Sequence, residues 1–243
     1  MMQVEPITRA MILAAGKGTR MRPAPDDVPK PLIEINGQAL LGRMIMRLAE
    51  AGIRRVVVNV HHKADRVENY LAAHDWPIEI VVSDERETLL ETGGGVKKAL
   101  PLLAADKFLV CNADIVWREN QPAIAGQSII DKLMGCYQAG NVHLLLAAPN
   151  ATTGYDGSGD FALVPQSAKG GHGFVRRLQN NIQNGQNENA YVFAGVQILT
   201  RDWVNKIADN FFSLNKIYDA ALASNHLTGY VMDGLWMHVG TKA

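Results

Sequence analysis

A short loop near the N-terminus combines glycines with a cluster of positive charges. It follows the apolar residues 10–14 and begins with Gly16 and Gly18, which let a backbone come close to an anion and aim its N–H groups at it. The cations of this loop are Lys17, Arg20, Arg22 and Lys30. Four cations beside a glycine turn can neutralise a triphosphate, so the loop predicts phosphate binding. A solvated basic loop is the alternative.

The spacing of these residues differs from two common phosphate-binding motifs. Met21 stands where a dinucleotide fingerprint has its third glycine, and the Gly-Lys-Ser/Thr of a P-loop does not occur. Pro29 and Pro31 flank Lys30 and fix the backbone around it, so holding this lysine in place costs less entropy. We therefore expect Lys30 to act as a fixed point charge on a phosphate that gains charge in a transition state.

The first half of the chain alternates between strand-like and helix-like segments. Strands are predicted at residues 10–14, 55–60, 78–82 and 108–111, and helices at residues 40–49, 64–73 and 94–103, the last ending near Pro101. Val56, Val57 and Val58 are apolar without alternation, which is typical of a strand buried on both faces of a parallel sheet. In such sheets ligands bind beyond the carboxyl ends of the strands, where the loop after residue 14 lies.

The pattern changes in the second half. A helix is predicted at residues 129–139 and a strand at 142–148, then antiparallel strands at 161–164, 173–177 and 191–199, helices at 201–208 and 215–224, and two last strands near Tyr230 and Trp236. We therefore predict the α/β class, with a Rossmann-like, mostly parallel sheet flanked by helices and a small antiparallel extension. The chain is expected to form a single domain over residues 1–243.

Polar residues follow the fourth predicted strand directly. Asn112 and Asp114 come after the apolar residues 108–111, so we expect their side chains at the carboxyl edge of the sheet. A turn or helix-capping aspartate is the alternative to a functional role for Asp114.

The composition indicates a globular protein without a bias towards polyanionic partners. The 243 residues are 47% hydrophobic and 20% charged, with 24 Lys and Arg against 24 Asp and Glu. This balance predicts neither a nucleic-acid nor a membrane partner. Residues 1–9 lack the pattern of a signal peptide, and Cys111 and Cys136 do not suggest a disulfide framework, so we expect a cytoplasmic protein.

The glycine loop and several later segments resemble the sugar-1-phosphate nucleotidyltransferases. The resemblance is carried by MILAAGKGTRMRP at residues 11–23 and PKPL at residues 29–32. Within this family, residues 91–95, 159–161 and 193–196 are similar to the branch of N-acetylmuramate-1-phosphate uridylyltransferases. The resemblance extends over nearly the whole chain, to residues 236–241. It implies the nucleotide-diphospho-sugar transferase fold, with a nucleotide-binding half over about residues 10–150 and a sugar-binding half over residues 151–243.

The resemblance also implies a set of site residues. The nucleotide would contact Ala14, Ala15, Gly16, Gly18, Thr19, Arg20, Lys30, Glu85, Thr92 and Gly93. In this set Glu85 would contact the nucleoside, and Thr92 and Gly93 would wall the base pocket. The sugar phosphate would contact Asn112, Gly159 and Asp160. Arg20, Lys30 and Asp114 would be the catalytic residues, with Asp114 binding Mg²⁺ or another divalent cation.

One position departs from the family pattern. The family carries a second metal-binding aspartate before a Val/Thr-Gly-Thr sequence, whereas this chain has His238 before Val239. Because Mg²⁺ prefers oxygen ligands and keeps several waters, histidine is a poor direct replacement. Either Asp114 and the nucleotide hold the metal with waters, or a softer divalent ion is used, or activity is reduced. The sequence allows His238 either as a metal ligand or as a structural residue.

The implied reaction is attack of a sugar 1-phosphate oxygen on the α-phosphorus of a nucleoside triphosphate, with release of pyrophosphate. The favoured substrates are UTP and N-acetylmuramate 1-phosphate, which give UDP-N-acetylmuramate in peptidoglycan recycling. A mannose-1-phosphate guanylyltransferase, which shares the glycine loop, is the first alternative. A weakly active module that senses nucleotide or sugar is the second, because of His238. Arg176 and Arg177 are interpreted as a charged pair at a strand edge, one of which could meet a sugar carboxylate.

Overall fold

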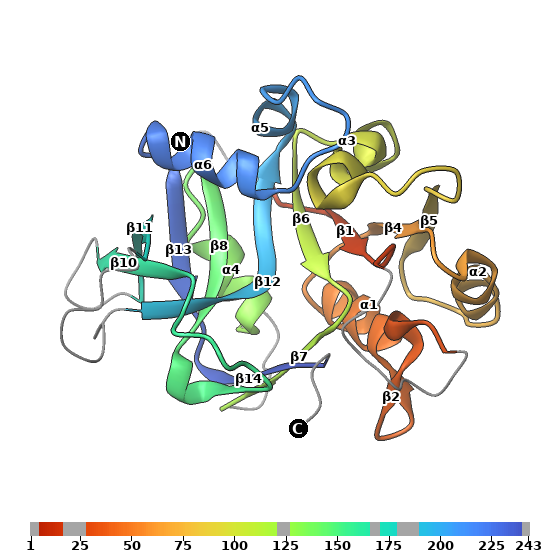
Figure 1. Cartoon of the computed structure of the whole chain (residues 1–243). Helices are drawn as coiled ribbons and strands as arrows, with labels where there is room; N and C mark the ends of the chain where they lie inside the picture. Colours follow the sequence, from red (N-terminus) through yellow and green to blue (C-terminus); the bar gives the residue numbers. More distant parts are fainter. Residues whose placement is uncertain (1–4, 17–27, 121–126, 166–170, 179–189, 240–243) are drawn as a thin grey trace.

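The computed structural model describes residues 5–16, 28–120, 127–165, 171–178 and 190–239 (Figure 1). The elements of the first half are β1 (Arg9–Leu13), β2 (Glu34–Ile35), β3 (Gln38–Ala39), α1 (Leu40–Glu50), β4 (Arg55–Val60), α2 (Ala64–Ala72), β5 (Glu79–Asp84), α3 (Glu91–Leu103), β6 (Lys107–Asn112) and β7 (Ile115–Glu119). Those of the second half are α4 (Ile129–Gly135), β8 (Val142–Ala147), β9 (Thr152–Thr153), β10 (Phe161–Pro165), β11 (His172–Arg177), β12 (Ala190–Thr200), α5 (Arg201–Asn205), α6 (Asn215–Ala223), β13 (Leu227–Val231) and β14 (Gly234–His238).

The parallel part of the main sheet confirms the α/β prediction. Among the described residues the sheet has the strand order β10-β11-β13-β8-β12-β6-β1-β4-β5, and β6, β1, β4 and β5 all pair in parallel. The strand β4 carries the continuous valine run, and Val56, Val57 and Val58 are completely buried. Burial on both faces explains why this strand lacks the polar–apolar alternation of a half-exposed one.

The rest of the main sheet is mixed. The long strand β12 runs antiparallel to β6 on one side and to β8 on the other, and so joins the parallel part to the extension. The start of β12 also pairs antiparallel with β10. Beyond it, β8 and β13 are parallel, while β10 and β11 form an antiparallel pair. The predicted extension is therefore present, and one strand pair inside it is parallel.

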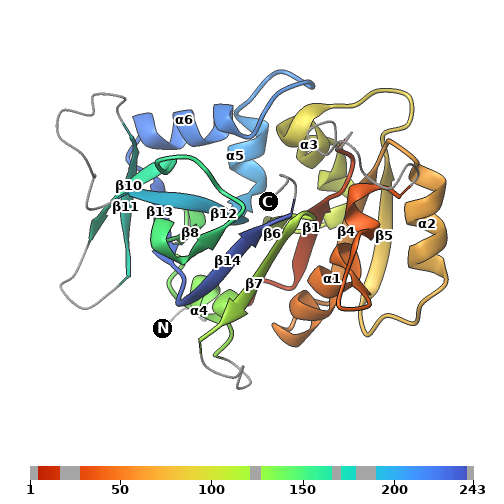
Figure 2. The ribbon, with the colours of Figure 1, turned by 60° about the horizontal axis from the view of Figure 1, so that its bottom comes forward.

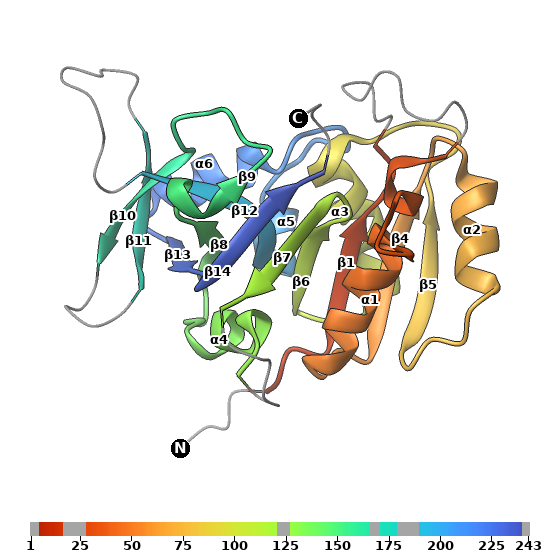
Figure 3. The same ribbon diagram turned by 90° about the horizontal axis from the view of Figure 1, so that it is seen from below.

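A small second sheet was not anticipated from the sequence. The strand β7 pairs antiparallel with β14, which also pairs with the short β9 (Figure 3). The two last strands of the chain, predicted near Tyr230 and Trp236, therefore belong to different sheets, since β13 joins the main sheet. The β7–β14 ladder lies across the face of the main sheet that α1 also covers (Figures 2 and 3).

Alternate residues of the parallel strands face two separate cores. Val56 and Val58 pack in one core with the apolar faces of α1, α2 and α4, and with Trp117 of β7. Val57 packs in the other core with residues of α3, α5 and α6. Figure 1 shows the latter three helices together on one side of the sheet. Both faces are thus covered, as a parallel sheet requires.

Several predicted boundaries were wrong. The helix predicted over residues 94–103 begins earlier, at Glu91. It ends at Leu103 as predicted, with Pro101 in its last turn, which a proline permits because only one backbone bond is lost. The helix predicted over residues 129–139 ends at Gly135, and that over 201–208 ends at Asn205. Among the described residues, no helix is both long enough and apolar enough to cross a bilayer.

A histidine is buried between β8 and β13. His143 is 1% exposed, and its Nδ1 lies 2.8 Å from Thr228 Oγ1, whose hydroxyl donates to the Val142 carbonyl at 3.3 Å. Burial, assisted by the nearby His172, lowers the pKa of His143 to about 4. The folded protein therefore holds this histidine neutral.

We expect this histidine to make the free energy of unfolding depend on pH. In the unfolded chain its pKa is the ordinary 6.5, so between pH 6.5 and about 4 the unfolded state binds a proton that the folded state does not. The stabilisation is complete above pH 6.5 and is lost as the pH falls to about 4, a difference of roughly 3 kcal/mol. Urea unfolding at a series of pH values should show a shallower decline for H143L than for the wild type. Parallel profiles would contradict the assignment.

Candidate active site

The site is built where three neighbouring parallel strands end in register. Leu13, the last residue of β1, pairs with Asn59 of β4 on one side and with Asn112 of β6 on the other. The Leu13 carbonyl also accepts a hydrogen bond from the Ala113 N–H at 3.2 Å. A cleft of about 290 Å³ opens at this edge, and its lining includes Ala14, Ala15, Gly16, Lys30, Thr92 and Asp114. The predicted edge of the sheet is therefore the place where these residues meet.

Lys30 and Asp114 form an ion pair inside this cleft. Lys30 follows Pro29 at the start of a 3₁₀ turn, and its Nζ lies 2.5 Å from Asp114 Oδ2. The Nε2 of His238 lies 3.3 Å from the same oxygen. Burial alone would raise the pKa of Asp114, but the His238 hydrogen bond and the Lys30 charge outweigh it and lower the pKa to about 2. Asp114 is thus a carboxylate under ordinary conditions.

His238 is held beside Asp114 by the β7–β14 ladder. His238 is in register with Ile115, the residue after Asp114, and the Val239 N–H donates to the Asp114 carbonyl at 2.9 Å. The His238 ring also stacks on Trp236, with the two planes 8° apart. Within the described part of the chain, no group of three or more His, Cys, Asp or Glu side chains forms a ready-made metal cage. Asp114 and His238 are only two such side chains, so they do not form a cage by themselves.

A second cleft adjoins the first. It has a volume of about 280 Å³ and lies between α6 and the strands β10 to β12. Thr92 and Asn112 line both clefts, so the two form one continuous surface. The second cleft also contains Asp160 and Arg177.

The side chain of Asn112 lies against a bulge in β12. The register of β12 with β8 shifts between Phe193 and Gln197, and Gly195 in the bulge has φ +77°. A Cβ added at Gly195 would lie 3.0 Å from Asn112 Nδ2. The glycine therefore gives both the left-handed backbone and the space that the asparagine occupies.

Asp160 is fixed by its own backbone and by a neighbouring strand. Gly159 before it has φ +108°, and its N–H donates to the Tyr155 hydroxyl at 3.1 Å. The Asp160 Oδ2 accepts a hydrogen bond from the Phe193 N–H at 2.8 Å. The glycine makes the turn that brings this carboxylate to the second cleft.

The run of glycines in α3 allows close packing around Thr92. The Phe212 carbonyl accepts hydrogen bonds from the N–H groups of Gly93 and Gly94, at 2.8 and 3.0 Å. A Cβ on Gly93 would meet the Phe212 ring at 2.3 Å. Thr92 Oγ1 accepts from the Leu214 N–H at 2.9 Å. Gly93 is buried and lies behind the wall of the first cleft, whereas Thr92 forms part of that wall.

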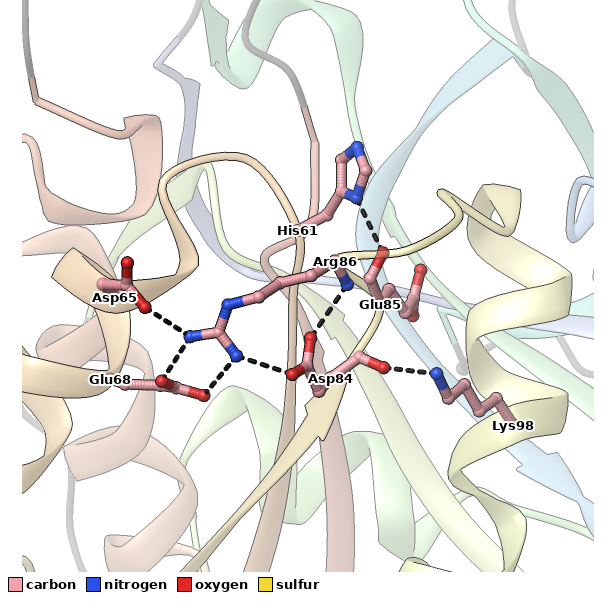
Figure 4. Close-up of polar contacts among 7 residues, drawn as sticks. All are labelled: His61, Asp65, Glu68, Asp84, Glu85, Arg86 and Lys98. Carbon is pink, nitrogen blue, oxygen red and sulfur yellow. Dashed lines mark hydrogen bonds and ion pairs between the residues drawn. The ribbon is translucent and has the colours of Figure 1, made fainter.

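Glu85 lies beneath the first cleft, although the resemblance implied a nucleoside contact. It is 0% exposed, and its carboxylate accepts from Asn59 Nδ2 at 2.8 Å and from the Leu90 N–H at 3.3 Å. A group without exposed surface makes no contact with a ligand in the cleft. The loop that contains it is also held from outside, where Arg86 contacts three carboxylates (Figure 4).

The triphosphate residues predicted after Gly16 lie outside the described residues. These are Gly18, Thr19 and Arg20, with the neighbouring cations Lys17 and Arg22. Of the other predicted residues, the structure brings Ala14, Ala15, Gly16, Lys30, Thr92, Asn112, Asp114 and Asp160 to the two clefts, with His238 beside Asp114.

Asn59 was not among the predicted site residues, and the role of Arg177 was left open. Asn59 lines the first cleft, and its signal was a single polar residue inside the apolar run of β4. Arg177 lines the second cleft, while its neighbour Arg176 does not, because successive side chains of a strand point to opposite faces.

Known proteins resemble this chain over most of its length. The MobA-like NTP transferase domain matches residues 10–124. The N-acetylmuramate alpha-1-phosphate uridylyltransferase of Caulobacter vibrioides is 37% identical, covering 95% of this chain and 91% of the relative. The protein of the same name from Neisseria meningitidis serogroup B is 31% identical, covering 96% and 93%. The mannose-1-phosphate guanylyltransferase catalytic subunit beta of Danio rerio is 26% identical, covering 96% of this chain and 61% of the relative.

Solved structures share the fold. A UDP-glucose pyrophosphorylase from Acinetobacter baumannii superposes with a TM-score of 0.77, covering 97% of this chain and 89% of the other. The two sequences are 17% identical, so this likeness concerns the arrangement of helices and strands alone.

Proposed function

The chain belongs to the sugar-1-phosphate nucleotidyltransferases, and we propose that its substrates are UTP and N-acetylmuramate 1-phosphate. The reaction gives UDP-N-acetylmuramate and pyrophosphate, and its product would serve the recycling of peptidoglycan. The observation that carries this proposal is the pair of joined clefts, with Lys30 and Asp114 in the first and Arg177 in the second. One domain would provide both clefts, the first mainly from residues 10–150 and the second mainly from residues 151–243.

The first cleft takes the nucleotide in this proposal. The backbone of Ala14, Ala15 and Gly16 lines it at the end of β1, and Thr92 and Gly93 form and support the opposite wall. The triphosphate would extend onto Gly18, Thr19 and Arg20 in the basic loop. The sugar phosphate takes the second cleft, against Asn112 and Asp160, and Gly159 makes the turn that brings Asp160 there.

The reacting phosphates then meet where the two clefts join. Lys30 lies in the first cleft, where its Nζ donates to Asp114. An oxygen of the sugar 1-phosphate attacks the α-phosphorus in line with the departing pyrophosphate. Lys30 and Arg20 stabilise the charge that builds on the phosphate oxygens, and the clefts hold the two substrates in the geometry for attack. A covalent enzyme intermediate is not needed, because the sugar phosphate brings its own nucleophile.

Asp114 is the residue suited to a divalent cation. It presents a carboxylate with a lowered pKa to the first cleft, next to the proposed position of the phosphates. Mg²⁺ is commonly held by one or two carboxylates together with substrate phosphates and waters, so a single aspartate with a nucleotide fits this ion. When bound, the cation would neutralise phosphate charge. His238 would orient the Asp114 carboxylate from behind through their 3.3 Å contact.

Arg177 favours a muramate over a mannose in the second cleft. Its guanidinium is held by Asp219 at 2.8 Å and Asn215 at 3.0 Å, and its side chain is 40% exposed. N-acetylmuramate carries a carboxylate on its lactyl group, and mannose has none. A fixed guanidinium pairs well with a carboxylate, so this residue supports N-acetylmuramate 1-phosphate against the guanylyltransferase alternative.

We expect pyrophosphate release to be fastest with UTP and N-acetylmuramate 1-phosphate. A matrix of UTP, GTP, CTP and ATP against N-acetylmuramate, mannose and glucose 1-phosphates should give this pair a kcat/KM at least about tenfold above any other. The D114N variant, purified in parallel, should lose about 100-fold or more and so exclude a contaminating enzyme. Preference for GTP with mannose 1-phosphate would favour the guanylyltransferase. Nucleotide binding without turnover at any divalent metal concentration would favour a sensing module.

Replacement of Arg177 should affect the sugar phosphate alone. For R177Q we expect the KM for N-acetylmuramate 1-phosphate to rise by about tenfold, because a charge-assisted bond is lost, with the KM for UTP nearly unchanged. The matched control is R176Q, which removes the same charge from the opposite face of β11. Equal effects of the two substitutions would show that Arg177 has no specific role.

His238 can be tested by restoring the carboxylate that the family pattern has at this position. In H238D two carboxylates face each other, which favours a cation between them, so half-maximal activity should require less Mg²⁺. Direct titration with Mn²⁺ should show tighter binding in the presence of nucleotide. H238N is the control without added charge. An unchanged metal dependence in H238D would mean that this position lies too far from the metal to act as a ligand.

A further inference from the structure

Two buried polar side chains lie under the start of the nucleotide loop. Asn59, 3% exposed, lies near the end of β4, and Glu85, 0% exposed, follows β5. Asn59 Nδ2 donates to Glu85 Oε1 at 2.8 Å, and Asn59 Oδ1 accepts from the Ala14 N–H at 2.7 Å. The other oxygen of Glu85 accepts from the Leu90 N–H at 3.3 Å. The chain of contacts therefore runs from Leu90 through Glu85 and Asn59 to Ala14.

The order of donors and acceptors in this chain has one solution. A carboxylate only accepts, so Glu85 requires the amide nitrogen of Asn59 on its side. The amide oxygen of Asn59 must then face the Ala14 N–H, which needs an acceptor. If the asparagine amide were turned over, it would set oxygen against carboxylate and N–H against N–H. Glu85 and the Ala14 N–H thus favour the same orientation of the Asn59 amide, with its oxygen towards the nucleotide loop.

The surroundings leave this pair little freedom. A Cβ added at Gly95 of α3 would lie 2.8 Å from Glu85 Oε1 and 3.0 Å from Asn59 Nδ2, so the helix packs directly against both. The backbone of Glu85 is held as well, since its N–H donates to the Val60 carbonyl at 2.8 Å and its own carbonyl lies 2.7 Å from His61 Nδ1 (Figure 4).

We propose that Asn59 and Glu85 are positioning residues that hold the start of the nucleotide-binding loop, with Glu85 acting through Asn59. Ala14 is the first residue after β1, and Ala15 and Gly16 continue from it along the first cleft. The Ala14 N–H is bound by Asn59, and the preceding carbonyl, that of Leu13, is bound by Ala113. Both sides of the peptide group between Leu13 and Ala14 are therefore fixed where the backbone turns towards the phosphates. This inference rests on the first cleft binding the nucleoside triphosphate.

The test exchanges the two functional groups. In N59D a carboxylate faces the carboxylate of Glu85. In E85Q the new amide has one NH₂ group, which must face one of the two existing donors, either Asn59 Nδ2 or the Leu90 N–H. Each single variant should raise the KM for the triphosphate by about tenfold or more, because a buried polar contact is broken. The double variant N59D/E85Q restores the chain with reversed roles. The new amide at position 85 would donate to the new carboxylate at position 59 and accept from Leu90, and that carboxylate would accept from Ala14.

The double variant should recover the KM for the triphosphate to within about threefold of the wild type, a coupling that independent sites do not show. The KM for the sugar 1-phosphate should stay within about twofold in all three variants, because the second cleft is untouched. E79Q is the control, since it makes the same change on β5 at an exposed residue. Thermal unfolding is recorded for every variant. N59S, which adds no charge, replaces N59D if that variant does not fold, and it should raise the KM for the triphosphate in the same way.

Three results would overturn the inference. The first is an equal loss for both substrates, which indicates general damage to the fold. The second is a lower melting temperature in the single variants with unchanged kinetic constants. The third is a double variant no better than the worse single one. Failure of the proposed substrates is recognised separately, because then the wild type itself does not turn over UTP with N-acetylmuramate 1-phosphate. The same cycle is then measured with the triphosphate that the wild type uses.

Discussion

The site depends on three parallel strands that end at the same level. The pairing of Leu13 with both Asn59 and Asn112 brings a backbone turn and two amide side chains to one edge of the sheet. A shift of one residue in either pairing would turn every side chain of a strand to the opposite core. The valines of β4 resist such a shift, because Val57 packs in one core and Val56 and Val58 in the other. Hydrophobic burial therefore sets the geometry in which the polar groups act.

The chemistry itself comes from segments that the sheet brings together from far apart. Lys30 stands on a proline-flanked turn, Asp114 on the turn between β6 and β7, and His238 at the end of β14. Lys30 and Asp114 pair with each other and so keep a local charge near neutral in a chain whose total charge is also zero. In the proposed reaction each of the two side chains gains a more highly charged partner. Lys30 then pairs with phosphate, and Asp114 pairs with a divalent cation. Both groups are held in place before substrates arrive.

Local patterns predicted the parallel part of the fold well. Continuous apolar runs identified β1, β4 and β6, and polar residues after them identified the edge where Asn112 and Asp114 emerge. The strand β7 was missed because it starts after a turn of only Ala113 and Asp114, too short to separate it from β6 by pattern. Its partner β14 is distant in the sequence, and no local rule predicts such a pairing. Glu85 was misinterpreted for a similar reason, since its burial depends on Asn59, Leu90 and Gly95 together.

The β7–β14 ladder has a consequence for how the protein is made. Asp114 and His238 are 124 residues apart, and β14 is the last strand of the described chain. During synthesis from the N-terminus, β1, β4, β5 and β6 can pair as soon as residue 112 has emerged. Asp114, however, can meet His238 only after residue 238 has emerged as well. A growing chain can therefore bury much of its parallel sheet while its reactive centre is still unassembled. The pairing of β14 with β7 is thus a late step in the assembly of the described fold.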